Sequence, residues 1–98
     1  MPTLRSEASI QRSVMDYAKK KGCLCKKLSV QGPMGNSGWP DYMILFHGSV
    51  YFIEFKKPGG KATPLQLELI AALRFHGFSA DVVDSVDDGR GIVDRLVR

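Results

Sequence analysis

Histidine and cysteine are scarce in this 98-residue chain, which contains two of each. His47 and His76 lie far from the cysteines and lack the ligand spacing of a zinc finger, so we expect no structural zinc site. Cys23 and Cys25 stand two residues apart in a segment with a strand-like pattern. Their Cα atoms would then be about 6.5–7 Å apart, at or beyond the usual limit for a disulfide. We therefore expect two free thiols that act as small core residues.

Long apolar runs are absent, and none approaches the length needed to span a bilayer. The first residues also lack the charged start and apolar stretch of a secretory signal. Neither glycine-rich phosphate-binding pattern, G-x-G-x-x-G or G-x-x-x-x-G-K-[ST], can be written onto residues 31–38. We expect a cytoplasmic protein without a membrane partner, folded as a single domain over residues 1–98.

The formal net charge of +4 is distributed unevenly. Residues 1–31 contain seven basic and two acidic side chains, a net charge of +5, so the rest of the chain has a net charge of −1. A cationic segment of this kind favours binding to a polyanion such as DNA, because cations near phosphates release condensed counterions. A solvated helix end, favoured by the helix dipole, is the plainer alternative. The candidate DNA-binding residues are Lys19, Lys20, Lys21, Lys26 and Lys27.

Hydrophobic periodicity and turn residues predict an α/β fold. Ser6 can cap a helix that ends near Gly22, with an apolar stripe of Ile10, Val14, Tyr17 and Ala18. Thr63 and Pro64 begin a second helix, with a stripe of Leu65, Leu69, Ala72, Leu73 and His76. The expected strands are 23–30, with Leu24, Lys26, Leu28 and Val30 on one face, then 41–46, 50–56 and 79–83, and residues 31–38 form a loop. Ile92, Val93, Leu96 and Val97 suggest a short closing helix. The order αβββαβ predicts a mixed sheet flanked by helices.

One carboxylate falls in an unusual place in the first predicted helix. Glu7 precedes Ile10 by three residues and Val14 by seven, so helical spacing puts it on the apolar stripe. A carboxylate is seldom buried without a partner. Glu7 is therefore a candidate for a functional or paired role.

Two short strings carry the strongest chemical signal: Gly38-Trp39-Pro40-Asp41 before one strand and Glu54-Phe55-Lys56 at the end of the next. Glu54 and Lys56 share a strand face because side chains alternate. Residues 47–49 join the two strands as a hairpin, which places Asp41 beside the segment from Glu54 to Lys56. Two carboxylates and an ammonium group are thus expected at one place.

This combination suits hydrolysis of a phosphodiester. A divalent cation held by Asp41 and Glu54 would reverse the local negative charge and take up charge that develops on the phosphate. Lys56 can orient or deprotonate the attacking water, or stabilise the transition state. Glu7 can join the outer shell of the metal, and Gln66 can hold the water or Lys56.

Each string alone also has an ordinary structural explanation. Pro40-Asp41 after a glycine-rich loop is a common turn, and Glu54 with Lys56 can be an exposed pair at a strand end. Their convergence in the hairpin, together with Glu7 on an apolar stripe, favours the catalytic interpretation.

The ordered set Glu7, Gly38-x-Pro40-Asp41, Glu54-Phe55-Lys56 and Gln66 resembles the VRR-NUC domain of the PD-(D/E)XK nuclease superfamily, over nearly the whole chain. The resemblance implies a restriction-endonuclease-like fold, with Asp41, Glu54 and the Phe55 carbonyl as metal ligands, Lys56 as the catalytic lysine, and Glu7 and Gln66 in supporting roles. It also implies Mg²⁺ as the cofactor, with Mn²⁺ able to substitute.

Short members of that family are similar to archaeal Holliday-junction resolvases, which implies a homodimer acting on branched DNA. A monomeric flap or single-strand nuclease is the alternative within the same chemistry. A nucleic-acid-binding module without catalysis is a different class, but such a protein would be expected to have lost at least one of Asp41, Glu54 and Lys56. An unrelated α/β interaction domain would show no salt-sensitive DNA binding.

Overall fold

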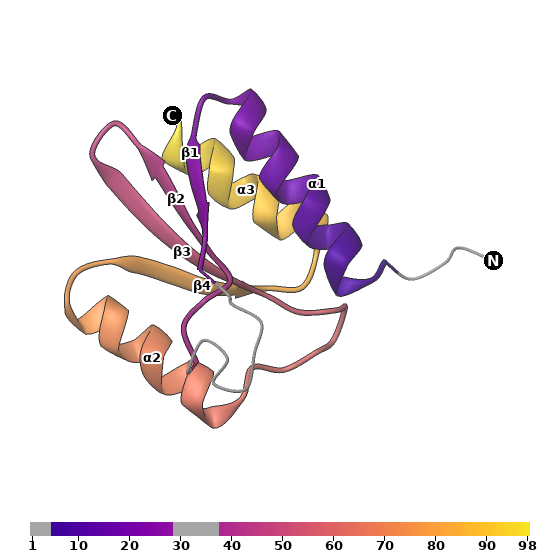
Figure 1. Ribbon diagram of the computed structural model, residues 1–98, viewed down its shortest axis with the longest axis vertical. Helices are drawn as coiled ribbons and strands as arrows, with labels where there is room; N and C mark the ends of the chain where they lie inside the picture. Colours follow the sequence, from indigo (N-terminus) through magenta and orange to yellow (C-terminus); the bar gives the residue numbers. More distant parts are fainter. Residues whose placement is uncertain (1–4, 29–37) are drawn as a thin grey trace.

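The computed structural model describes residues 5–28 and 38–98. Its elements follow in the order α1 (Glu7–Lys20), β1 (Leu24–Lys27), β2 (Tyr42–Phe46), β3 (Ser49–Phe55), α2 (Pro64–Phe75), β4 (Ser79–Val83) and α3 (Val86–Leu96). The expected order αβββαβ, with a closing helix, is therefore confirmed (Figure 1). The end of the expected first strand, residues 29–30, and most of the expected loop 31–38 lie outside the described residues.

The four strands form one mixed sheet in the order β1-β2-β3-β4. β1 pairs antiparallel with β2, β2 antiparallel with β3, and β3 parallel with β4. The β2–β3 hairpin turns through His47 and Gly48, both with positive φ, a conformation that allows a two-residue connection between twisted strands. In this register Tyr42 pairs with Ile53. One residue before Tyr42, Asp41 lies beside the segment from Glu54 to Lys56, as the sequence predicts.

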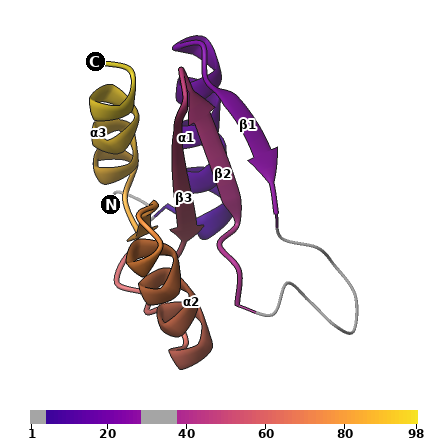
Figure 2. The same ribbon diagram turned by 90° about the vertical axis from the view of Figure 1, so that its left-hand side faces the viewer.

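Helices cover both faces of the sheet (Figures 1 and 2). The consecutive residues Phe52 and Ile53 of β3 point to opposite faces and belong to different apolar clusters. Ile53 packs with α1 and α3, and Phe52 packs with Ile70 and Leu73 of α2. Glu54, two residues after Phe52, is therefore on the α2 face.

The helix ends follow the expected capping chemistry. The Ser6 side chain accepts a hydrogen bond from the Ser9 N–H at 3.0 Å, and Gly22 follows the helix with a φ of +92°. Thr63 and Gln66 form a capping box at the start of α2. The closing helix is longer than expected and begins at Val86, because Ser85 caps it by accepting from the Asp88 N–H.

Two expectations about buried helix faces need correction. On α2 the buried residues are Ile70 and Leu73, whereas Leu65 is 54% exposed and Ala72 and His76 are also exposed, so the predicted stripe is rotated by about one residue. Tertiary packing against β4 selects the buried face. Along β1 and the residue after it the predicted alternation is present: Leu28 packs on the α2 face and Cys25 on the opposite face, while Leu24 is 70% exposed.

The second correction concerns Glu7, which is exposed rather than facing the core. Glu7, Ile10 and Val14 form one helical stripe, but the apolar cluster does not cover the first turn of α1, where Glu7 lies. The cysteines, by contrast, behave as expected. Both are free thiols, and Cys23 is buried in the core.

Candidate active site

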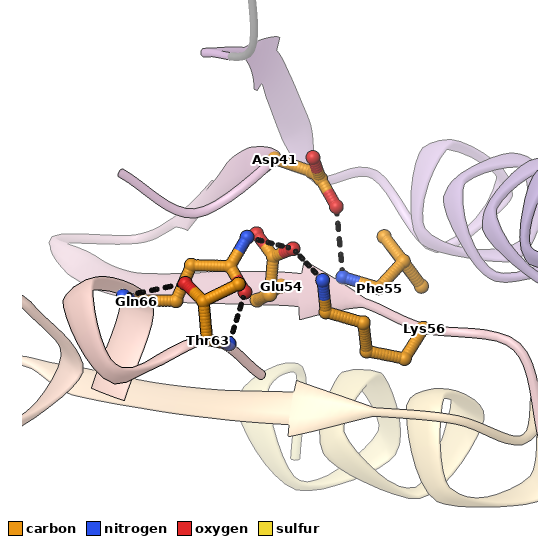
Figure 3. A network of polar contacts seen from close by, with 6 residues as sticks. All are labelled: Asp41, Glu54, Phe55, Lys56, Thr63 and Gln66. Carbon is orange, nitrogen blue, oxygen red and sulfur yellow. Dashed lines mark hydrogen bonds and ion pairs between the residues drawn. The ribbon is translucent and has the colours of Figure 1, made fainter. Parts of the chain in front are cut away.

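Asp41 is fixed at the start of β2 by two backbone contacts. Its Oδ2 accepts a hydrogen bond from the Phe55 N–H at 2.8 Å, across the hairpin (Figure 3). Its carbonyl accepts from the Leu28 N–H at 2.7 Å, which ties it to the end of β1. Burial raises the pKa of Asp41, and the Phe55 N–H and Lys56 act in the opposite direction. The sequence prediction that Asp41 lies beside the segment from Glu54 to Lys56 is confirmed.

Glu54 is the one buried charged residue among those described, with 3% of its surface exposed. Its Oε2 accepts a hydrogen bond from Gln66 Nε2 at 3.0 Å and forms an ion pair with Lys56 Nζ at 3.3 Å (Figure 3). Its other oxygen, Oε1, is buried and has no hydrogen-bond partner among the described residues. A buried, unpaired carboxylate oxygen is costly, so a ligand for Oε1 would stabilise this arrangement.

Burial, together with the neighbouring charge of Asp41, raises the pKa of Glu54 to about 7. Lys56 opposes both effects, and Glu7 adds a smaller effect in the upward direction. Repulsion between Asp41 and Glu54 is the expected property of two carboxylates without a cation between them. Glu7, although exposed, is close enough for its charge to act on Glu54.

Gln66 has a different contact from the one expected. The sequence suggested that it would hold water or Lys56, but its amide nitrogen donates to Glu54 instead. The capping box explains this orientation: Gln66 Oε1 accepts from the Thr63 N–H at 2.8 Å, and this contact turns Nε2 toward the carboxylate (Figure 3). Thr63 thereby orients Glu54 through Gln66. The Thr-x-x-Gln spacing is typical of a capping box, but the sequence did not predict that Gln66 of this box would contact Glu54.

The donor set matches a hard divalent cation. Asp41 and Glu54 supply two carboxylates, and Glu54 Oε1 is oriented by bonds to its sister oxygen while remaining without a partner of its own in the described chain. No group of three or more histidine, cysteine, aspartate or glutamate residues able to hold a metal occurs within 5–28 and 38–98. Mg²⁺ retains several waters and needs one or two protein carboxylates, so a sparse set is sufficient.

The five candidate DNA-binding lysines are all exposed, but the structure separates them. Lys19 and Lys27 line one pocket of about 350 Å³ between α1 and the sheet, together with Arg12 and Tyr42. Lys21 lies 5.2 Å from the centre of the Tyr17 ring. Arg12 was not singled out from the sequence, although it stands seven residues before Lys19 and so shares a helix face with it. Lys27 also acts electrostatically on Asp41.

The same architecture occurs in known proteins. One solved structure described as a VRR_NUC domain is 31% identical, with a TM-score of 0.73, and the match covers 93% of this chain and 92% of that one. A second, described as a VRR_NUC domain protein, is 26% identical with a TM-score of 0.73, over 97% and 90% of the two chains. The "Putative nuclease p44" of Acyrthosiphon pisum secondary endosymbiont phage 1 is 35% identical over 82 residues, 83% of this chain and 85% of that protein.

The chain belongs to the VRR-NUC family of nucleases. No family model matches it, so the assignment depends on these individual relatives. Nucleases of this family and of the PD-(D/E)XK superfamily generally require a divalent metal, in agreement with the donor set described above. Within the described part of the chain, no helix is long and apolar enough to cross a membrane.

The raised pKa of Glu54 predicts a pH-dependent stability in EDTA. A carboxyl group whose folded pKa lies above its unfolded value stabilises the fold fully below the unfolded pKa and loses that contribution as pH rises through the folded pKa. The free energy of unfolding should therefore fall between about pH 4.5 and 7, by on the order of 3 kcal/mol from this group.

Urea unfolding of the wild type and of Glu54→Gln at pH 5 and pH 8 measures this effect. Glutamine retains an acceptor for Gln66 and Lys56 but cannot ionise, so the variant should be the more stable protein at pH 8 and should lose less stability between the two pH values. Equal pH dependence in the two proteins would contradict the assignment of this titration to Glu54.

Proposed function

We propose that this VRR-NUC nuclease is a Mg²⁺-dependent DNA endonuclease whose catalytic residues are Asp41, Glu54 and Lys56. The observation that carries the proposal is the buried Oε1 of Glu54, which has no partner within residues 5–28 and 38–98 and stands beside a second carboxylate. Asp41, Glu54 and the Phe55 carbonyl would hold the metal. When bound, Mg²⁺ would offset the negative charge of the phosphate and of the transition state.

The protein's own groups have separate tasks in this mechanism. Lys56 is restrained by its ion pair with Glu54, and 18% of its side-chain surface is exposed, so its ammonium group can reach a substrate. There the ammonium would orient the attacking water or stabilise charge on the phosphorane, and it could accept a proton from the water only after losing its own. Gln66 holds the Glu54 carboxylate in place, and Glu7 acts on it through its charge.

Metal dependence gives a direct test. Mg²⁺ or Mn²⁺ should support cutting of labelled linear, flapped and four-way DNA, whereas EDTA should abolish it. Ca²⁺ should permit DNA binding with little cutting, because its looser and higher coordination positions water poorly. Independently of activity, Mn²⁺ should raise the melting temperature of the wild type but not that of Glu54→Gln. Full activity in EDTA would exclude the mechanism.

We further propose that the enzyme is a homodimer that cuts four-way junctions. One site cuts one strand, whereas resolving a junction needs two symmetric cuts, which a two-fold dimer provides. Large apolar side chains on and just after α2 are exposed and offer a surface for a second copy: Leu65, Leu67, Phe75 and Phe78. A monomeric flap or single-strand nuclease is the alternative.

Light scattering decides between these assemblies. We expect twice the protomer mass of 10.8 kDa at micromolar concentration, and a shift to the protomer mass in Leu67→Ser/Phe75→Ser. The double variant should keep its fold, since both side chains are exposed. A wild-type monomer that cuts flaps and leaves four-way junctions intact would refute the dimer proposal without affecting the catalytic assignment.

A further inference from the structure

Trp39, the chain's single tryptophan, lies two residues before Asp41. Its ring centre is 6.2 Å from that of Phe52 at a tilt of 58°, so part of the ring packs on the α2 face of the sheet. Even so, 42% of the residue is exposed. A large aromatic surface is thus accessible to solvent beside two carboxylates and a lysine.

The backbone around Trp39 is fixed on both sides. Gly38 has a φ of +86°, and a Cβ at this position would lie 2.8 Å from Leu65 Cγ and 3.1 Å from the Leu65 carbonyl oxygen. Only glycine therefore permits this close approach to the first turn of α2. On the other side, Pro40 is fully buried. The indole is consequently held in a defined position before any ligand arrives.

Charged side chains share a sheet face with the Trp39 ring. Phe52 and Glu54 alternate along β3 and share one face of the sheet. Lys26 is exposed and belongs to the same cross-strand row, since it pairs with Met43 and Met43 pairs with Phe52. The Trp39 ring is therefore on the same face as the carboxylate proposed to hold the metal and as a cation able to contact a neighbouring phosphate.

We propose that Trp39 is a stacking platform for an unpaired nucleobase of DNA next to the scissile phosphate. Bases in an intact duplex are already stacked on their neighbours and present only their edges, so this ring can take a base only where the strand is single, flapped or open at a branch. The inference rests on the proposed nuclease function and deepens it by naming the feature of the substrate that is read. If Trp39 served only to cover Phe52, each experiment below would give a different result.

The first experiment uses the fluorescence of Trp39, which no other tryptophan obscures. Wild-type protein in EDTA is titrated with a thymidine oligonucleotide of about twelve residues and with an abasic strand that has the same number of phosphates. We expect the thymidine strand to quench the emission and to bind about 5- to 100-fold more tightly than the abasic strand, as measured by fluorescence anisotropy. Equal emission changes and equal affinities for the two strands would overturn the proposal.

The second experiment measures cleavage by Trp39→Leu and Trp39→Phe in Mg²⁺. On DNA that is unpaired at the cut site, Trp39→Leu should lose about 5- to 100-fold in kcat/KM, while Trp39→Phe retains most of it because a smaller ring still stacks. On fully paired duplex both variants should stay within twofold of the wild type. Loss of packing on Phe52 should lower the melting temperature, whereas loss of stacking on a base should not. Melting temperatures of both variants therefore separate the two effects.

The possible outcomes distinguish this inference from the proposed function. Cleavage that is unchanged in Trp39→Leu, or lowered equally on paired and unpaired substrates, would refute the platform and leave the nuclease intact. Base-dependent quenching in a protein that cuts no DNA in any metal would refute the nuclease and support the platform. Should Trp39→Leu fail to fold, the wild-type titration still decides the matter.

Discussion

Glu54→Gln is expected to slow DNA cleavage by at least about 10³-fold, among the largest catalytic effects in the chain. The substitution preserves the size of the side chain and an acceptor for Gln66 and Lys56. It removes the charge and replaces one oxygen of the carboxylate whose buried Oε1, without a partner in the described part of the chain, is best suited to a metal. Asp41→Ala, Glu54→Ala and Lys56→Ala should likewise abolish cleavage. Single-turnover cleavage with Mg²⁺ and enzyme in excess over DNA measures these effects.

DNA binding gives the necessary control. All these variants should bind DNA within about tenfold of the wild type, because affinity depends mainly on phosphate contacts made by lysine and arginine elsewhere. Glu68→Gln neutralises an exposed carboxylate on α2 and should cut normally. Wild-type turnover in any correctly folded variant of Asp41, Glu54 or Lys56 would refute the catalytic assignment.

The supporting residues should have smaller effects. Gln66→Ala leaves Glu54 with Lys56 alone at Oε2 and should slow cleavage by about 10–100-fold, the usual range for groups that orient a ligand. Glu7→Ala should also slow the reaction less than the loss of a metal ligand does. Thr63→Val removes the hydroxyl that accepts from the Gln66 N–H but keeps the backbone N–H that holds the Gln66 side chain, so it should slow cleavage less than Gln66→Ala.

Gly89→Ala is expected to destabilise the protein by about 2 kcal/mol, the largest effect on folding from a single methyl group. A Cβ at Gly89 would overlap Val14 Cγ2 and lie 2.9 Å from Cγ1. Val14 is fully buried and cannot move aside. The overlap between α1 and α3 should outweigh the gain of about 1 kcal/mol that alanine normally brings to a helix. Urea unfolding in EDTA gives the difference, which corresponds to a fall in melting temperature of about 8–16 °C.

The same helix contains a matched control. A Cβ at Gly91 would meet no atom closer than Arg95 Nη1 at 3.6 Å, which is an ordinary contact. Gly91→Ala should therefore stabilise the protein by about 0.5–1 kcal/mol. Removing the Val14 side chain should also rescue Gly89→Ala, so that Val14→Ala/Gly89→Ala is less destabilised than the sum of the single variants. Equal effects of Gly89→Ala and Gly91→Ala would exclude a close helix contact at Gly89.

The sequence by itself determined the parts of the site that follow from local rules. The short turn at His47 and Gly48 sets the register of the hairpin, and the register places Asp41 beside Glu54 and Phe55. Strand alternation puts Glu54 and Lys56 on one face. Because local rules control each step, the arrangement of these three residues follows from the order of amino acids alone.

Contacts between distant segments were decided only by the tertiary structure. The buried face of α2, the exposure of Glu7 and the grouping of Arg12 with Lys19 and Lys27 all depend on how a helix docks on the sheet. Helical periodicity predicts an apolar stripe. It does not predict how the helix is rotated against the neighbouring element, or how much of the stripe that element covers. For the same reason the link from Thr63 through Gln66 to Glu54 was not predicted: its first half is a local capping box, and its second half joins α2 to β3 only when the helix is packed in place.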